Sequence, residues 1–307
     1  MVNVFIDGSA GTTGLRIRER LAIRDDISVT TLPEELRKDP SARRDALNAA
    51  DIAFLCLPDA AAVEAAELIE NGHTSVIDTS TAHRTSPGWV YGMPELSGQR
   101  EKITVSKRIA NPGCHASGFI ALIAPLVRAG LIPENQHLSC FSVTGYSGGG
   151  RKMIEEYENA YRSPLLAAPR QYGLGQQHKH LREMTAVCGL KNPPAFSPIV
   201  ADFYSGMEVS VTLFDVDIGL VKNVLRDAYN GPVIHYEDGS DEAGFLSAAA
   251  LSGRDDMEIT VYGTDERALL TARFDNLGKG ACGAAIQNMN LLIGVGETTG
   301  LLLKGAN

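Results

Sequence analysis

The chain has 307 residues, enough to form two modest domains or one large domain around a sizeable core. Hydrophobic residues make up 44% of the sequence and charged residues 21%, as is usual for a soluble globular protein. The formal net charge of −9 argues against a general nucleic-acid binder and leaves room only for a local phosphate site. We therefore expect a small-molecule substrate as the partner, and no nucleic acid.

Cysteine usage and hydropathy indicate where the protein works. The five cysteines are scattered, odd in number and form no CxxC pair, so they predict thiols in a reducing cytoplasm instead of disulfides or a zinc ribbon. The sequence begins directly with a strand-like run and has no stretch of about 20 apolar residues. We expect a cytoplasmic protein without a secretory signal or a membrane span.

The first third of the chain alternates between apolar runs and helical patterns. Strands buried on both faces read as near-continuous apolar runs, and strands that alternate with helices form parallel sheets. This part therefore predicts an α/β fold with a doubly wound, parallel sheet. The expected strands are at residues 2–6, 27–32, 51–57 and 75–78, and the expected helices at 15–21 and 60–71.

After about residue 113 the pattern changes to alternating strands, which predict a second domain with a mostly antiparallel sheet. Its expected strands are at 137–144, 206–214 and 257–262, and its expected helices at 116–129 and 221–229. A helical pattern returns at 281–292, and we expect it to pack against the first domain. The predicted domains are residues 1–113, completed by a C-terminal helix at about 281–307, and residues 114–280.

Glycines recur every three residues where the first strand would join the first helix. Such glycines allow a tight turn and let backbone N–H groups approach a pyrophosphate at the helix N-terminus. An ordinary strand-to-helix turn is the alternative, but the position at the start of a βαβ pattern favours dinucleotide binding. The predicted cofactor-binding residues are Gly8, Ser9, Ala10, Gly11, Thr12, Thr13 and Gly14.

The end of the second strand favours NADP over NAD. Thr30 and Thr31 stand where an NAD site usually has an acidic residue that binds the ribose hydroxyls. Arg37 and Lys38 could bind the 2′-phosphate of NADP or could form a solvated charged face, and the two glutamates at 34–35 weaken the inference.

Cys114 is the candidate nucleophile. Pro112 and Gly113 end the preceding segment, so Cys114 falls at or just before the start of the apolar helix. A helix N-terminus stabilises a thiolate, and a thiolate can attack an acyl carbon to form a thioester. A lone cysteine is more commonly a small buried residue, and we assign that role to the other four.

Two histidines are candidates for the acid or base that such chemistry needs. His178 and His180 lie near the start of a helical stripe, so we expect one to face the thiol and the other to bind substrate or serve the structure. Inside the helix they would point to nearly opposite sides. The pair could also bind a metal, but no third ligand cluster lies nearby, and we predict no metal site. His115, adjacent to Cys114, ranks third.

Two segments could bind a phosphate group. Ser147 and Gly148 begin a glycine-rich run that ends in Arg151, and Arg84 follows the end of a predicted parallel strand. Either arginine could instead form a salt bridge within its loop, so which arginine binds phosphate stays open.

These segments together resemble the N-acetyl-γ-glutamyl-phosphate reductase family of arginine biosynthesis, in the shorter of its two forms. The match is ordered and spans nearly the whole chain. Its most specific elements are the Pro-Gly-Cys run that ends at Cys114 and the block at residues 275–281. The other matching segments are residues 8–14, 76–80 with Arg84, 91–96, 147–151, 178–180, 287–290 and 297–300.

The resemblance implies a Rossmann-type domain and an α+β catalytic and dimerisation domain of the semialdehyde-dehydrogenase type. It also implies NADPH as cofactor, a homodimer or homotetramer, and Cys114 as the catalytic cysteine, with Pro58 and Asn276 near the cofactor. Residues 181–183, Leu-Arg-Glu, follow the histidines where the longer form usually has Thr-Pro-Glu. This departure leaves open which histidine is the acid or base.

The implied reaction is the NADPH-dependent reduction of N-acetyl-L-glutamyl 5-phosphate to N-acetyl-L-glutamate 5-semialdehyde through a thioester on Cys114, with release of phosphate. The nearest enzymatic alternative is an aspartate-semialdehyde-type dehydrogenase, and a related carrier-bound substrate of a lysine pathway is another. Alternatives from other classes are a nucleotide sensor without turnover and a metal hydrolase that uses His178 and His180.

Overall fold

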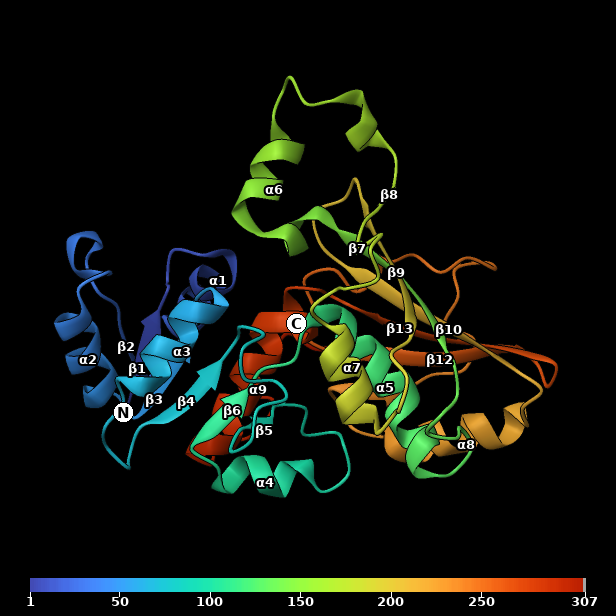
Figure 1. The fold of residues 1–307 in the computed structure, drawn as a ribbon, viewed down its shortest axis with the longest axis horizontal. Helices are drawn as coiled ribbons and strands as arrows, with labels where there is room; N and C mark the ends of the chain where they lie inside the picture. The colour runs from blue at the N-terminus through green and yellow to red at the C-terminus, as the bar shows by residue number, and fades with distance from the viewer. Residues whose placement is uncertain (306–307) are drawn as a thin grey trace. The chain divides into compact units, whose positions relative to one another are not determined.

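The computed structural model describes residues 1–305. The chain divides into two compact units (Figure 1). Unit 1 comprises Met1–Pro94, Gly98–Pro112 and Ala281–Leu301, and unit 2 comprises Glu95–Ser97, Gly113–Gly280 and the residues from Leu302 on. The chain therefore leaves unit 1 just before Cys114 and returns to it just after Gly280.

Unit 1 is built on a parallel sheet with the strand order β2-β1-β3-β4-β6-β5. The central strands β3 and β4 are buried along their whole length, which explains their largely apolar sequences and confirms the predicted fold class. The strands are β1 (Val2–Asp7), β2 (Ile27–Thr30), β3 (Ile52–Leu55), β4 (Ser75–Asp78), β5 (Val90–Tyr91) and β6 (Arg108–Ala110).

Five helices accompany this sheet among the described residues: α1 (Thr12–Leu21), α2 (Pro40–Ala49), α3 (Asp59–Glu67), α4 (Gln99–Val105) and α9 (Gly283–Ile293). The last of them comes from the far end of the sequence and packs against β4 and α4. Its residues from Gly283 to Asn290 are buried, so α9 is part of the core of unit 1.

Unit 2 is built on a sheet with the strand order β11-β12-β13-β10-β7-β9-β8. The β7–β9 and β11–β12 pairs are parallel and the other pairs are antiparallel, which confirms the mostly antiparallel prediction. The strands are β7 (Ser139–Gly145), β8 (Arg170–Gln171), β9 (Ala195–Ala201), β10 (Met207–Phe214), β11 (Ile234–Tyr236), β12 (Met257–Thr264) and β13 (Arg267–Phe274).

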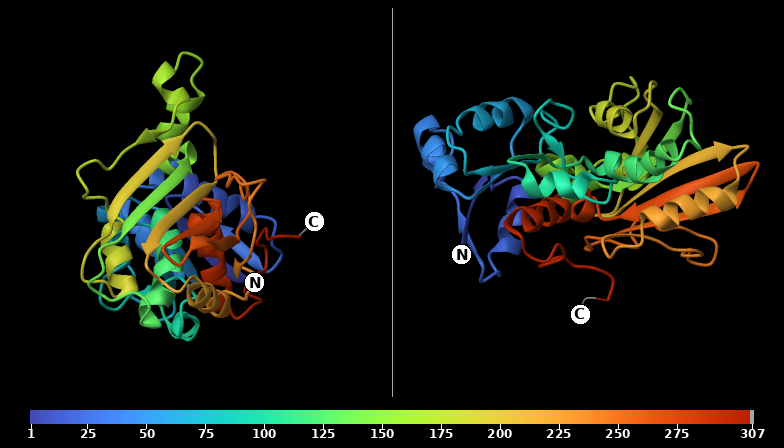
Figure 2. Two further views of the ribbon diagram at one scale, coloured as in Figure 1. Left: turned by 90° about the vertical axis from the view of Figure 1, so that its right-hand side faces the viewer. Right: turned by 90° about the horizontal axis from the view of Figure 1, so that it is seen from below.

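The helices of unit 2 are α5 (Cys114–Arg128), α6 (Gly150–Glu158), α7 (Leu181–Cys188) and α8 (Ile218–Ala228). Helix α5 contacts β10 and β13 of the sheet and the helices α7 and α8. Figure 2 shows α8 running alongside the strands. Because every residue from His115 to Ile123 is buried, α5 forms the centre of the unit's core.

The opposite face of this sheet, which we call the outer face, carries partly exposed apolar side chains. Strand register places Phe141, Ser210, Thr212 and Leu269 on it, because directly paired residues share a face. Phe214 lies on the same face two positions after Thr212, and it is 66% exposed, while Phe141 is 48% exposed. A sheet face of this kind is suited to contact with another protein surface.

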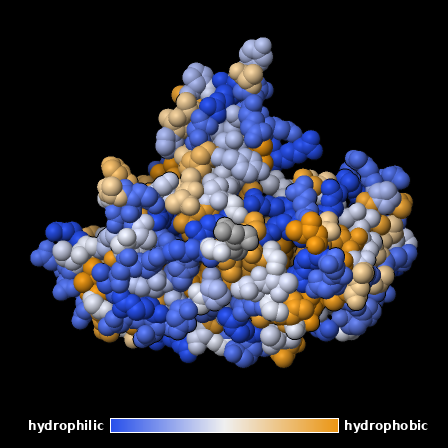
Figure 3. Space-filling view, turned by 180° about the vertical axis from the view of Figure 1, so that it is seen from behind, coloured by the Kyte–Doolittle hydropathy of each residue, from blue (hydrophilic) through white to orange (hydrophobic). Residues whose placement is uncertain are grey.

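Among residues 1–305, no helix combines the length and the apolar character needed to cross a bilayer. On the face drawn in Figure 3, apolar residues form separate patches among hydrophilic ones.

Candidate active site

Cys114 is the first residue of α5, as the Pro-Gly sequence before it predicts. It is half-buried, whereas Cys140, Cys188 and Cys282 are buried. A Cβ built on Gly280 would lie 2.9 Å from the Cβ of Cys114, closer than such atoms normally approach. Gly280 therefore lets the chain pass directly beside the candidate nucleophile.

The segment before Gly280 is fixed by buried polar groups. The Nζ of Lys279 lies 2.7 Å from the Oε1 of Glu95, and both side chains are buried. The Oδ1 of Asp275 accepts hydrogen bonds from the backbone N–H groups of Leu277 and Gly278, at 2.6 and 3.0 Å. These contacts hold the backbone in place where it borders Cys114.

The other thiols have environments that disfavour ionisation. Burial raises the pKa of Cys140 and of Cys188 well above the usual range. Cys56 is half-buried and not fully buried as the sequence predicts, but burial of its thiol raises its pKa to about 12. None of these three is suited to act as a thiolate near neutral pH.

His178 and His180 meet in unit 2, with ring centroids 4.7 Å apart and the rings at 83°. Both rings also lie close to His115, at 5.8 and 5.6 Å. They come just before α7, where helical periodicity does not yet apply, so they face each other and not opposite sides. His178 is half-buried, while His180 is buried.

His115 occupies the centre of a buried hydrogen-bond network. Its Nδ1 lies 2.7 Å from the Oγ of Ser142 on β7, and its Nε2 lies 2.7 Å from the hydroxyl oxygen of Tyr172. Burial, together with the neighbouring His178, lowers the pKa of His115 to about 3. Its ring is therefore neutral near pH 7 and carries one N–H group.

Tyr172 is a site residue that the sequence does not indicate. It lies just after the two-residue strand β8, and its ring centroid is 5.9 Å from that of His178. Burial raises the pKa of Tyr172, and the nearby Cys114 raises it further, so the phenol keeps its proton. Its distance from Cys114 in the sequence leaves no local pattern by which it could be found.

Glu183 is a second residue that sequence reasoning leaves without a role. Its side chain is almost fully buried, and its Oε2 accepts a hydrogen bond from the backbone N–H of Gly113 at 3.1 Å. Its Oε1 lies 4.0 Å from the Nε2 of His180. Glu183 stands in the first turn of α7, three residues after the N-cap residue His180, and this position is a signal that could have identified it.

Asn276 lies in unit 2 and holds the glycine-rich run that begins at Ser147. Its Oδ1 accepts a hydrogen bond from the N–H of Gly206 at 2.9 Å, and its Nδ2 donates to the Oγ of Ser147 at 3.0 Å. Ser147 is buried and Gly148 is exposed. The expectation that Asn276 lies near a nicotinamide stays a prediction, because these contacts show only a supporting role.

The two candidate arginines differ in their surroundings. Arg84, in unit 1, is buried, and it donates hydrogen bonds from Nε to the carbonyl of Asn111 and from Nη2 to that of Thr79. Arg151, in unit 2, has a side chain that is 79% exposed and pairs with Glu155 at 2.7 Å. Arg84 is thus fixed by two backbone carbonyls, while Arg151 can move to meet an anion.

The glycine loop of unit 1 has a shape that only glycine permits. Gly8 has a φ of +87°, and a Cβ there would lie 2.2 Å from the carbonyl oxygen of Cys56. A Cβ on Gly14 would lie 2.5 Å from the carbonyl oxygen of Gly8. The loop joins β1 to the N-terminus of α1, and Pro58 caps α3 at the end of the neighbouring strand β3. This cradle fits a dinucleotide pyrophosphate.

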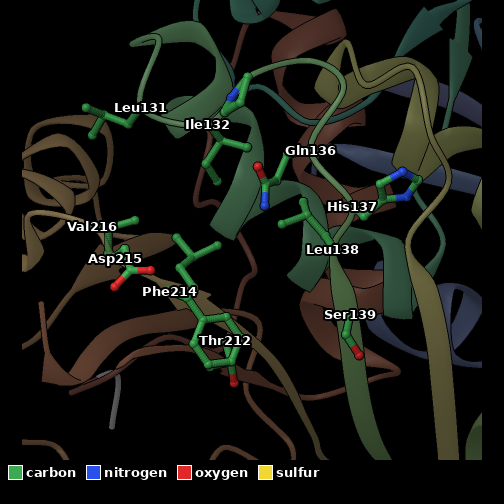
Figure 4. Close-up of a pocket in the computed structure, with 12 residues that line it drawn as sticks. Leu131, Ile132, Gln136, His137, Leu138, Ser139, Thr212, Phe214, Asp215 and Val216 are labelled. Atoms are coloured by element: carbon green, nitrogen blue, oxygen red, sulfur yellow. The ribbon is translucent and has the colours of Figure 1, made fainter. Parts of the chain in front are cut away.

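A separate cavity of about 680 Å³ lies at the other end of α5 (Figure 4). Its lining includes Leu131, Ile132, His137 and Phe214. Helix α5 has 15 residues and is therefore about 22 Å long. The cavity follows its C-terminal end, so it does not belong to the group of residues around Cys114.

In chemical terms, unit 2 presents a thiol at a helix start, a histidine pair, and a protonated phenol. A thiolate there can form a thioester with an activated acyl group, and the other groups can donate or accept protons. Unit 1 presents a loop that fits a dinucleotide. Together these are the parts needed for reductive acyl transfer.

Comparison with known proteins agrees with this chemistry. Residues 8–105 match the model of the semialdehyde dehydrogenase NAD binding domain, and residues 114–276 match that of the semialdehyde dehydrogenase dimerisation domain. The chain therefore contains a domain that binds a nicotinamide dinucleotide. Among solved structures, aspartate semialdehyde dehydrogenase from Francisella tularensis has a TM-score of 0.72 at 17% identity, covering 95% of this chain and all of that chain. That likeness shows the shared fold.

Curated relatives are closer in sequence. The N-acetyl-gamma-glutamyl-phosphate reductase of Brucella anthropi is 47% identical over 95% of this chain and 98% of its own length. The N-acetyl-gamma-glutamyl-phosphate reductase 2 of Pseudomonas putida is 45% identical over 97% of this chain and 98% of its own length. The chain belongs to the N-acetyl-gamma-glutamyl-phosphate reductase family.

Proposed function

We propose that the protein uses NADPH to reduce N-acetyl-L-glutamyl 5-phosphate to N-acetyl-L-glutamate 5-semialdehyde, with release of phosphate, in arginine biosynthesis. The observation that carries this proposal is the position of Cys114 at the start of α5, with Tyr172 and the histidine pair in the same unit. The substrate follows from the names of relatives that are 42–47% identical over nearly the whole chain.

The first step of the proposed reaction takes place at Cys114. Its thiolate sulfur attacks the acyl carbon, the bond from that carbon to the phosphate oxygen breaks, and phosphate leaves with the bonding electrons. The product is a thioester on Cys114. The start of α5 favours this step, because the partial positive charge at a helix N-terminus stabilises the negative sulfur.

His178 is the proposed acid and base. Its side chain is half-buried, as that of Cys114 is. His180, in contrast, is buried and lies beside Glu183. His115 is kept neutral by burial and by the neighbouring His178. His178 can therefore exchange protons with substrate and solvent, and it would protonate the aldehyde-forming intermediate or assist its collapse. His180 would then position His178, whose ring it contacts.

The glycine loop at residues 8–14 and Pro58 would hold the cofactor. When bound, the nicotinamide supplies the hydride that reduces the thioester. The preference for NADP is supported by Arg37, whose buried Nε has no hydrogen-bond partner among the described residues, and by Lys38 beside it. Arg37→Ala should weaken NADP binding more than NAD binding, which fluorescence titration with each dinucleotide would measure.

The departing phosphate has candidate partners in both units. Ser147, Gly148 and Arg151 offer a glycine-rich run with an exposed guanidinium, and Arg84 offers a fixed one. Arg151→Ala and Arg84→Ala, each assayed for the KM of inorganic phosphate in the reverse reaction, would assign the role. The variant that raises this KM identifies the arginine that binds phosphate.

The reverse reaction tests the whole proposal. With N-acetyl-L-glutamate 5-semialdehyde, NADP and phosphate, the protein should form NADPH, whereas aspartate semialdehyde should react poorly. Cys114→Ser should lower kcat by at least about a thousandfold, while Cys188→Ser, a buried control, should retain activity. A Cys114→Ser variant with most of the activity would contradict the thioester route.

We also propose that the protein forms a homo-oligomer and that it is located in the cytoplasm. The outer face of the unit 2 sheet and the match to a dimerisation domain support a homodimer or homotetramer. Five cysteines that form no disulfide in the structure support a reducing, cytoplasmic location.

A further inference from the structure

Three side chains link the core of unit 2 to the surroundings of Cys114. The hydroxyl of Ser142 lies 2.7 Å from Nδ1 of His115, and the Nε2 of the same ring lies 2.7 Å from the hydroxyl of Tyr172. Each member comes from a different element: β7, α5 and the segment after β8. Folding therefore brings these three hydrogen-bonded side chains together from distant parts of the sequence.

The exposure of these three side chains increases from Ser142 through His115 to Tyr172. Ser142 and His115 are 1% and 3% exposed, whereas Tyr172 is half-buried, as are Cys114 and His178. The hydroxyl of Tyr172 bonds to the ring of His115, the residue after Cys114, and its own ring centroid lies 5.9 Å from that of His178. Tyr172 is thus the member of this hydrogen-bonded series that lies toward the candidate nucleophile and the candidate acid, and the two buried members support it.

The neutral ring of His115 has one N–H group, so its direction determines what the phenol can do. In one arrangement the Ser142 hydroxyl donates to Nδ1 and the Nε2–H donates to the Tyr172 oxygen. The phenol hydrogen then points away from His115 and can be donated to another group. In the other arrangement the phenol donates to Nε2 and has no hydrogen to offer.

We propose that Tyr172 donates a hydrogen bond to the oxygen of the substrate carbonyl as that oxygen becomes negative, and that His115 and Ser142 position it. This inference rests on the proposed function. It makes Tyr172 a catalytic residue, and His115 and Ser142 positioning residues.

The step balances without any proton transfer from Tyr172. When the thiolate sulfur bonds to the acyl carbon, the π electrons of the carbonyl move to its oxygen. The same electrons then restore the double bond as the bond to phosphate breaks and phosphate departs. The phenol keeps its proton throughout and stabilises the charge only while it exists, which is how such a donor accelerates a reaction.

Acylation can be tested without any dinucleotide. Wild-type protein mixed with freshly prepared N-acetyl-L-glutamyl 5-phosphate should release one phosphate per active site, and intact-mass spectrometry should show the acyl group on Cys114. Tyr172→Phe should slow this single turnover by roughly a hundredfold. The matched control is Tyr161→Phe, because Tyr161 is 97% exposed and should leave the rate unchanged.

The concentration dependence of the same reaction separates catalysis from ground-state binding. For Tyr172→Phe we expect the half-saturating substrate concentration to stay within about threefold of the wild-type value, with the loss in the limiting rate. A raised half-saturation concentration with an unchanged limiting rate would overturn the proposal, because Tyr172 would then bind the substrate's ground state. An unchanged rate at all concentrations would overturn it as well.

Ser142→Ala, made alone and together with Tyr172→Phe, tests the positioning role. It should slow acylation by about tenfold in the wild-type background, and should have no further effect in the Tyr172→Phe background, since coupled residues are not additive. Additive losses would show that Ser142 acts only through general stability. A rate equal to wild type in Ser142→Ala would remove His115 and Ser142 from the proposal.

The failure of this inference can be told apart from the failure of the proposed function. If wild type and Tyr161→Phe release no phosphate from N-acetyl-L-glutamyl 5-phosphate, the proposed function is wrong. If both release it and Tyr172→Phe matches them, only the role of Tyr172 is wrong.

Discussion

The ionisable side chains around Cys114 are held in different states by their surroundings. Burial keeps His115 neutral and Tyr172 protonated. Glu183 is buried too, but it accepts a backbone N–H and lies near His180, so it has partners suited to a carboxylate. One small region therefore contains a candidate nucleophile, a neutral imidazole, a phenol that can donate a hydrogen bond, and a carboxyl group that accepts one from the backbone.

His115 predicts how stability depends on pH. Its pKa is about 3 in the folded protein and near 6.5 in the unfolded chain, so the unfolded chain binds more protons between these values. Stability should therefore fall as pH drops below about 6.5, by up to about 1.4 kcal/mol per pH unit from this group. Urea denaturation at pH 7, 6 and 5 would measure the slope.

The comparison of two histidine variants isolates this effect. His115→Gln should have a shallower slope than wild type, while His73→Gln, altered at an exposed position, should keep it. Equal slopes for His115→Gln and wild type would show that the ring is not kept neutral.

Glu183 predicts a coupled loss of stability and thiol reactivity. Glu183→Ala removes the acceptor of the buried Gly113 N–H and should lower the free energy of unfolding by about 1–3 kcal/mol. Because Gly113 precedes Cys114, the alkylation rate of Cys114 by iodoacetamide should change as well. Denaturation and timed alkylation would measure the two effects.

Two further substitutions serve as controls for Glu183→Ala. Glu183→Gln keeps an oxygen acceptor and should recover most of the stability. Glu134→Ala, which breaks an exposed pair with Lys191, should cost less than about 1 kcal/mol. Full stability in Glu183→Ala would show that the hydrogen bond from the Gly113 N–H to Glu183 does not stabilise the fold.

The sequence identifies those site residues that belong to a local sequence motif. Cys114 follows Pro-Gly at a helix start, and the histidine pair precedes another helix, so both could be predicted. Tyr172 and Ser142 could not, because their roles arise only when β7 and the segment after β8 come together. The hydrogen-bond network of His115 could not be predicted either, since its adjacency to Cys114 in the sequence says nothing about Ser142 or Tyr172. Its third rank as an acid or base stays a prediction.

Among the elements, apolar periodicity predicts β1 to β4, β7, β10 and β12, but it gives no strand at β5, β6, β11 or the largely buried β13. It misses α2, whose ten residues contain few large apolar side chains and whose start is instead marked by the Asp39 cap. It also misses β9, which contains Pro198. That proline is tolerated because only the two-residue strand β8 lies on that side of β9.

The loop between β1 and α1 predicts a difference between two glycines. Gly14→Ala would place a Cβ 2.5 Å from the Gly8 carbonyl oxygen, so it should lower the free energy of unfolding by about 1–3 kcal/mol. It should also weaken NADP binding, which fluorescence titration would show. An unaltered stability and affinity would mean that the loop can rearrange.

Gly11 supplies the matched control for stability. Its φ is −74°, and a Cβ there would lie 3.6 Å from the carbonyl oxygen of Gly8, an ordinary contact distance. Gly11→Ala should therefore change the free energy of unfolding by less than about 1 kcal/mol.

For the whole molecule, the outer face of the unit 2 sheet predicts self-association. Phe141→Glu places a charge among the apolar side chains of that face and should weaken the oligomer at least tenfold in Kd, on the order of a hot-spot substitution. Sedimentation velocity across a concentration series would measure the shift to smaller species. Phe245→Glu, at a 76% exposed position on a loop after β11, should leave assembly unchanged. Identical sedimentation of Phe141→Glu and wild type would exclude this face from the interface.

The return of the chain to unit 1 after Gly280 has a consequence for synthesis on the ribosome. The strands of unit 1 emerge early, but α9, which packs against β4 and whose Asn288 donates to the carbonyl of Gly92, is translated after nearly all of unit 2. During translation, unit 1 therefore stays incomplete until most of unit 2 has been synthesised. A nonsense codon shortly after Gly280 would leave unit 2 nearly whole and deprive unit 1 of its last helix, although most of unit 1 is encoded at the opposite end of the message.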